Sequence, residues 1–140
     1  MIEFNYETDF NLVDYELIAA WIESVILSEG KTLGDINYIF CDDTYLEIIN
    51  KEYLNHNTLT DIISFDYCVG NEMSGDIFIS VERVADNAND YKVSFDNELR
   101  RVMVHGVLHY CGYKDKTSND ELLMRSKEDE KLQMFHGEQS

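Results

Sequence analysis

The chain has 140 residues, a length that suits one domain with a hydrophobic core of its own. Hydrophobic residues make up 44% of it and aromatic residues 12%, values that exclude a disordered chain. The formal net charge of −17 repels DNA and anionic membrane surfaces, so we expect neither as a partner.

Sequence features also indicate the compartment. The apolar runs are too short to span a bilayer, and Met1–Phe4 lacks the basic and apolar regions of a secretory signal. The three cysteines (Cys41, Cys68 and Cys111) have no C-x-x-C spacing, which favours reduced thiols over a disulfide framework or a cysteine zinc site. We therefore expect a cytoplasmic protein that consists of a single domain, residues 1–140.

The charge is unevenly distributed along the chain. Residues 1–99 hold 21 acidic and four basic side chains, whereas residues 100–131 hold seven basic and six acidic ones. A polyanion would therefore have to approach through the C-terminal third. A charge run of this kind also occurs on ordinary solvated helices, so on its own it does not indicate a binding surface.

Apolar periodicity predicts the first half of the chain as helix, strand, helix. Residues 12–28 are apolar at three- and four-residue spacing, with Gly30 at a position typical of a helix end. Ile36–Cys41 is β-branched and aromatic and predicts a strand. A second helix begins at Asp43 or Thr44, with Thr44 and Glu47 spaced as a capping box and an apolar side formed by Leu46, Ile49 and Tyr53.

The second half begins with a loop at Asn55–Thr58. Strands follow at Ile62–Tyr67 and Ile77–Ile79, and the polar stretch Gly70–Gly75 between them predicts a hairpin. Three helices complete the chain: a short one at 81–88, one from Ser94 to Cys111 ended by Gly112, and one after the capping box Ser118/Glu121 that ends near residue 134. We expect an α+β fold, a small mixed sheet of about four strands packed with about five helices.

The residues with catalytic potential lie in His105–Asp115. His105 and His109 are four residues apart on a predicted helix, about 400° of rotation, so both imidazoles project from one face. Gly112 can adopt the left-handed conformation that reverses a chain after a helix, which brings Asp115 back toward the histidines. Two histidines and one carboxylate leave a coordination position open for water, the pattern of a catalytic zinc site. The sequence therefore predicts one Zn²⁺ per chain, held by His105, His109 and Asp115 with a bound water as the attacking group.

Zinc peptidases of the extended H-E-x-x-H type share this spacing. In them a glutamate directly after the first histidine acts as the general base. Here that position is Gly106, so a peptidase would need an acid from elsewhere in the fold. His56 and His136 are predicted to be surface residues.

Several segments together resemble the YbeY-type endoribonucleases, also called rRNA maturation factors. Residues His105–Asp115 follow that family's signature H-G-x-L-H-L-x-G-Y-D-H. Asn50–Tyr53 is similar to its L-N-x-x-Y-R segment, Thr60–Phe65 to its T-D-V-L-S-F segment and Gly75–Ile79 to its G-D-I-x-I strand. The resemblance covers nearly the whole chain, and the combination of segments is specific.

The chain departs from the family pattern at three places. The third histidine of the signature falls on Asp115, a harder donor that makes the choice of metal less determined. The arginine after the tyrosine falls on Leu54, so Lys51, Arg100 or Lys114 would have to contact a phosphate in its place. Family prolines fall on Leu59 and Asp66.

The resemblance implies metal-dependent endonuclease activity on single-stranded RNA, in maturation of the 3′ end of 16S ribosomal RNA and in ribosome quality control. It also implies the ribosomal particle or ribosomal proteins as partners. Two alternatives remain open: a non-catalytic ribosome-assembly factor with a structural metal, for which the acidic surface argues, and the metallopeptidase.

Overall fold

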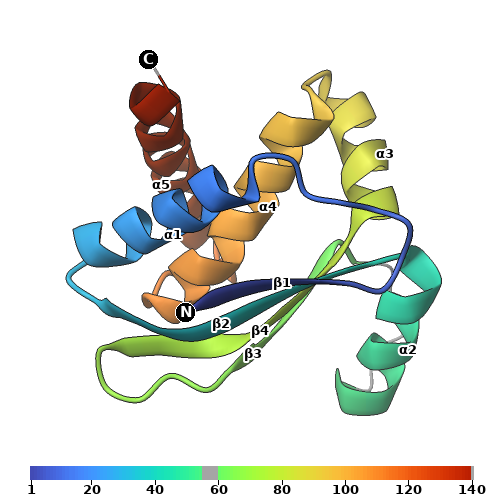
Figure 1. Cartoon of the computed structure of the whole chain (residues 1–140), viewed down its shortest axis with the longest axis horizontal. Coiled ribbons are helices and arrows are strands. Elements are labelled where there is room, and N and C mark those ends of the chain that lie inside the picture. Colours follow the sequence, from blue (N-terminus) through green and yellow to red (C-terminus); the bar gives the residue numbers. More distant parts are fainter. Residues whose placement is uncertain (55–59, 140) are drawn as a thin grey trace.

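A computed structural model describes residues 1–54 and 60–139 of the chain. Its elements, in order, are β1 (Ile2–Tyr6), α1 (Tyr15–Ser28), β2 (Thr32–Cys41), α2 (Asp43–Leu54), β3 (Ile62–Asp66), β4 (Glu72–Ser80), α3 (Val81–Tyr91), α4 (Phe95–Tyr110) and α5 (Ser118–Gln139). The strands form one mixed sheet in the order β1-β2-β4-β3. Parallel pairs join β1 to β2 and β2 to β4, and the hairpin β3–β4 adds an antiparallel edge. The α+β expectation is confirmed (Figure 1).

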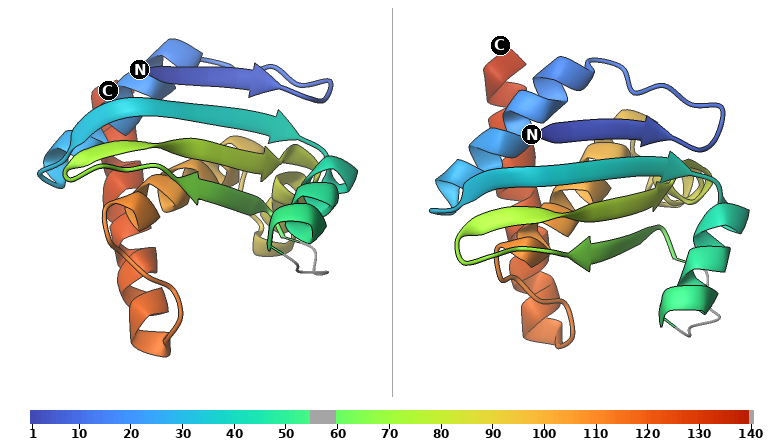
Figure 2. Two further views of the ribbon diagram at one scale, coloured as in Figure 1. Left: turned by 90° about the horizontal axis from the view of Figure 1, so that it is seen from below. Right: turned by 60° about the horizontal axis from the view of Figure 1, so that its bottom comes forward.

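The helices cover the two faces of the sheet unequally. In Figure 2, α1, α4 and α5 lie on one face, and α2 lies on the other at one end. The main core fills the first layer and includes Trp21, Tyr38, Phe40 and Met103, none of them exposed. A smaller cluster of Cys41, Leu46, Ile49 and Ile63 lies under α2. Alternation along the strands explains both clusters, because successive side chains point to opposite faces.

Helix α4, which carries His105 and His109, packs closely against the sheet at β3 and β4. A Cβ atom on Gly106 would lie 3.1 Å from Cδ1 of Ile62 and 3.2 Å from Cδ1 of Ile77, so a larger residue would require these side chains to shift by a few tenths of an ångström. At Gly75, an added Cβ would collide with the Tyr110 hydroxyl and the Phe65 carbonyl. The Tyr110 hydroxyl donates to that carbonyl at 2.8 Å and ties α4 to the edge strand β3.

Several predicted boundaries differ from the structure. β2 and β4 are longer than predicted, and the predicted strand at Ile62–Tyr67 ends one residue earlier. The first helix begins at Tyr15, the short helix extends to Tyr91 and the last one to Gln139. The elements predicted from the sequence do not include strand β1, although the alternation of Ile2, Phe4 and Tyr6 with polar residues is typical of a strand. The predicted loop at Asn55–Thr58 lies outside the described residues.

Both predicted capping boxes are wrong by one or two residues. The side chain of Asp42, not Thr44, accepts from the backbone N–H of Tyr45 at 2.8 Å at the start of α2. At the start of α5, Thr117 and Asp120 exchange side-chain to backbone hydrogen bonds, in place of Ser118 and Glu121. The apolar side of α2 is shorter than predicted, because Tyr53 is 67% exposed.

Candidate metal centre

Helix α4 supplies two of the three predicted ligands. Ser94 caps its start by accepting from the backbone N–H of Asn97, and His105 and His109 follow one turn apart near its end. Their ring centroids are 4.5 Å apart, and the two Nε2 atoms lie 3.0 Å from each other. The predicted common face is therefore observed.

The turn after α4 brings Asp115 to the same point. Gly112 has a φ of 108°, and the backbone N–H of Tyr113 donates back to the carbonyl of Leu108 at 3.1 Å. This reversal places Asp115 Oδ2 3.2 Å from Nε2 of His109 and 3.4 Å from Nε2 of His105. The structure thus brings together the three residues predicted as ligands.

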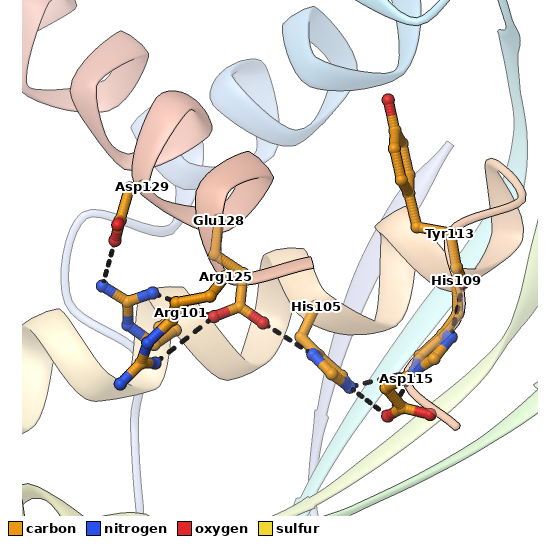
Figure 3. Close-up of polar contacts among 8 residues, drawn as sticks. All are labelled: Arg101, His105, His109, Tyr113, Asp115, Arg125, Glu128 and Asp129. Carbon is orange, nitrogen blue, oxygen red and sulfur yellow. Dashed lines mark hydrogen bonds and ion pairs between the residues drawn. The ribbon is translucent and has the colours of Figure 1, made fainter. Parts of the chain in front are cut away.

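The other ring nitrogens of both histidines bind acceptors within the chain (Figure 3). Nδ1 of His105 lies 2.7 Å from Oε2 of Glu128, and Nδ1 of His109 lies 2.9 Å from the backbone carbonyl oxygen of Tyr113. Both partners are hydrogen-bond acceptors, so each Nδ1 carries a hydrogen, and a neutral imidazole in this position has its lone pair on Nε2. Two such lone pairs and a carboxylate oxygen at one point repel one another unless a proton or a metal cation lies between them.

The donor set fits a metal ion in geometry as well as in chemistry. The three ligand atoms lie within 4.8 Å of one another. Zinc–nitrogen distances of about 2.0–2.1 Å in a tetrahedron separate the donors by about 3.3 Å. The observed separations of 3.0, 3.2 and 3.4 Å surround that value. Three protein donors leave a position for a water or a substrate oxygen.

Electrostatics favour a positive charge at His105. Burial by itself lowers the pKa of this imidazole, but the hydrogen bond to Glu128, with the charges of Glu128, Asp115 and Asp61, raises the pKa above its ordinary value. The pKa of Glu128 is lowered, because its bonds to His105 and Arg101 outweigh the effect of its burial. The site is therefore arranged to hold a cation.

A cavity of about 260 Å³ opens onto the three predicted ligands, and its walls also include Thr60, Asp61, Ile62 and Ser64, before and within β3. Burial raises the pKa of the Asp61 carboxyl. A second hollow of about 300 Å³ shares His105 and Asp115 with it and extends toward Arg101 and Arg125. Asp61 is not among the site residues predicted from the sequence, although it lies in the family-like segment Thr60–Phe65. Packing of that segment against α4 in the fold is what brings Asp61 to the cavity.

Position 106, where zinc peptidases carry the glutamate that acts as general base, cannot supply such a base here. Gly106 is buried and faces the sheet at Ile62 and Ile77, so a glutamate there would enter the packed core. Asp61 instead supplies a second carboxylate to the cavity from a distant segment.

The remaining predicted residues lie as follows. His136 is exposed, as expected, and His56 lies outside the described residues, as does the side chain of Leu54. Arg100 is poorly placed for a phosphate, because its guanidinium stacks 4.6 Å over the Phe135 ring and its Nε is buried. Lys51 pairs with Glu47 at 3.0 Å. Lys114 is exposed in the turn directly before Asp115 and lies closest in sequence to the ligands.

Comparison with known proteins identifies the family. The family model described as Endoribonuclease YbeY matches residues 3–136. A protein of that name from Flavobacterium johnsoniae is 68% identical over 139 residues, which cover 99% of this chain and 100% of the relative. The protein of the same name from Bacteroides thetaiotaomicron is 46% identical over 114 residues, which cover 81% of this chain and 83% of the relative.

A solution structure of a Thermotoga maritima protein agrees in fold, with a TM-score of 0.70 at 23% identity over 99% of this chain and 91% of that one. No helix among the described residues is long and apolar enough to cross a bilayer. The resemblance seen in the sequence segments is confirmed by the whole-chain matches, and the chain belongs to the endoribonuclease YbeY family.

Proposed function

We propose that this chain is a single-domain, zinc-dependent endoribonuclease in which His105, His109 and Asp115 hold one Zn²⁺. The observation that carries the proposal is the convergence of two imidazole Nε2 atoms and one carboxylate oxygen at a cavity. Nitrogen donors with a single carboxylate favour zinc over magnesium or calcium, which prefer oxygen ligands.

A bound divalent ion supplies a Lewis acid for a phosphoryl oxygen and lowers the pKa of a coordinated water toward about 7. The chain's own residues supply the rest. His105 and His109 would fix the position of the metal ion, and the Asp115 carboxylate would offset part of the positive charge of that ion. Asp61, in the cavity wall, offers a carboxylate within the same space. Lys114 is exposed beside the site and is the cation we assign to a substrate phosphate.

We propose that the substrate is single-stranded RNA. The enzyme would act in the cytoplasm, in maturation of the 3′ end of 16S ribosomal RNA and in ribosome quality control. The name carried by the relatives, endoribonuclease, supports RNA as the substrate class. The net charge of −17 supports docking on a ribosomal particle or ribosomal protein in addition to RNA contacts.

The same charge favours one competing function, a ribosome-assembly factor whose metal is only structural. Structural zinc sites are closed by four protein ligands, whereas here three ligands border an open cavity. The cavity therefore argues for catalysis.

A nuclease assay on the purified protein decides between the two functions. We expect cleavage of single-stranded RNA that is lost with a chelator, restored by Zn²⁺ and absent in His109→Ala. Metal bound at full occupancy without any cleavage of RNA, free or in ribosomal particles, would leave the assembly factor as the function.

A further inference from the structure

Glu128 lies on α5 and reaches the metal centre across the interface between α4 and α5. Its side chain is only 6% exposed, and its Oε2 lies 2.7 Å from Nδ1 of His105. A buried carboxylate requires partners for both oxygens, since an unpaired buried charge is strongly unfavourable. The position of Glu128 is therefore set by the groups around it.

The second oxygen of Glu128 is held by arginines. Nη1 of Arg101 lies 2.9 Å from Oε1, and Nη1 of Arg125 lies 3.5 Å from the same atom. Arg101 is itself fixed, because its Nη2 lies 2.7 Å from Asp129. Figure 3 shows this chain of contacts running from Asp129 through Arg101 and Glu128 to His105. Because both carboxylate oxygens are paired with other side chains, Glu128 is held in this orientation and is not itself one of the predicted metal ligands.

The two histidines differ in what holds them. His109 donates to a neutral backbone carbonyl, whereas His105 donates to a carboxylate. An anionic acceptor holds the proton on Nδ1, fixes the ring plane and increases the electron density at Nε2, which strengthens the bond to a metal.

We propose that Glu128, held by Arg101, is a positioning residue of the metal centre and sets its metal affinity through His105. This inference rests on the proposed zinc site, and it assigns part of the affinity to a residue 23 positions away from that histidine. The competing explanation is that Arg101–Glu128 only joins α4 to α5. That explanation predicts a loss of stability in Glu128 variants with unchanged metal affinity.

The test compares Glu128→Gln with Asp129→Asn, a matched control that changes the other acidic partner of Arg101 and leaves the Glu128–His105 contact in place. Zinc affinity is measured by competition with a chelator, the Co²⁺ absorption spectrum reports ligand geometry, and urea unfolding of metal-free protein reports stability. We expect Glu128→Gln to lose zinc affinity by about 10–100-fold and to alter the Co²⁺ spectrum. Glu128→Asp, which keeps the charge, recovers part of the affinity, and Asp129→Asn stays within about threefold of the wild type.

Two results overturn the inference in distinguishable ways. If Glu128→Gln binds zinc like the wild type while His109→Ala does not, the zinc site stands and the role of Glu128 is refuted. If His109→Ala also binds zinc like the wild type, the zinc site itself is refuted. A measurement without a variant covers the case in which Glu128→Gln does not fold: ¹⁵N spectra of the zinc-loaded wild type must show the His105 proton on Nδ1, and a proton on Nε2 contradicts the inference.

Discussion

His105 and His109 each use one ring nitrogen inside the fold and leave the other for the cavity. The Nδ1 contacts at 2.7 and 2.9 Å hold the rings in place before any ion binds. Neither histidine is expected to compensate for loss of the other, because each supplies one of the three predicted donors that the described residues bring together.

The first prediction follows from this arrangement. The wild type carries about one Zn²⁺ per chain, and both His105→Ala and His109→Ala lose it. Elemental analysis after gel filtration measures the metal content. Full retention of zinc by both variants would contradict the assignment of these histidines.

Asp115 is the predicted ligand at which the chain departs from its family's signature. Asp115→Ala removes one of three donors and a negative charge, so we expect it to weaken zinc binding substantially. Asp115→His keeps most of the affinity, because zinc accepts imidazole as readily as carboxylate, and Asp115→Asn falls between them. Zinc affinity measured by chelator competition orders the three variants.

Asp120 is the control for that series. It is an acidic residue five positions after Asp115, and the structure engages it with Thr117 in the cap of α5. Asp120→Ala therefore lowers stability by about 1 kcal/mol and leaves zinc affinity unchanged. A loss of zinc confined to Asp120→Ala would move the third ligand to that position.

At the scale of elements, the turn at Gly112 carries the carbonyl of Tyr113 and the carboxylate of Asp115. Its φ of 108° strains any other residue, although an added Cβ would meet nothing within 4 Å. We expect Gly112→Ala to cost about 1–2 kcal/mol of stability and also to weaken zinc binding, since the turn must shift.

Gly30→Ala is the matched control for the turn. Gly30 ends α1 with a φ of 74° and also has nothing within 4 Å of an added Cβ. It lies outside the walls of the metal cavity. The expected result is a similar shift of the urea midpoint with unchanged zinc affinity. Equal zinc affinity in both variants would show that the Gly112 turn does not position Asp115.

The sequence predicts site residues that lie close together in the chain better than those that packing brings in from other elements. Helix periodicity and the glycine at position 112 were enough to predict that His105, His109 and Asp115 come together, because the three lie within 11 consecutive residues. Glu128 and Asp61 were not predicted as site residues, because packing of α5 and β3 against α4 brings them there and no local spacing records it. The capping residues were misplaced because neighbouring Thr, Ser and Asp residues satisfy the same local pattern, and only backbone geometry selects one.

At the scale of the whole molecule, most basic side chains of the C-terminal third serve the fold. Lys131 is buried and pairs with Glu29 at 2.8 Å, Lys127 contacts Glu29 and Glu130, and Arg101 is held by Glu128 and Asp129. Lys114, Lys116 and Arg125 are more exposed. A region with nearly balanced charge in the sequence therefore offers few cations to a polyanion.

The last prediction is a weak dependence of RNA binding on salt. Two to four phosphate contacts with single-stranded RNA give a slope of log K against log salt of about −1.4 to −2.8. The remaining surface, with its net charge of −17, opposes further contacts. Affinity for free RNA is then low, and tight engagement requires a protein surface on the ribosomal particle. Binding titrations with the zinc-loaded protein at several salt concentrations measure the slope. A slope steeper than about −5 would require an array of exposed cations, which the internal pairing of Arg101, Lys127 and Lys131 does not leave.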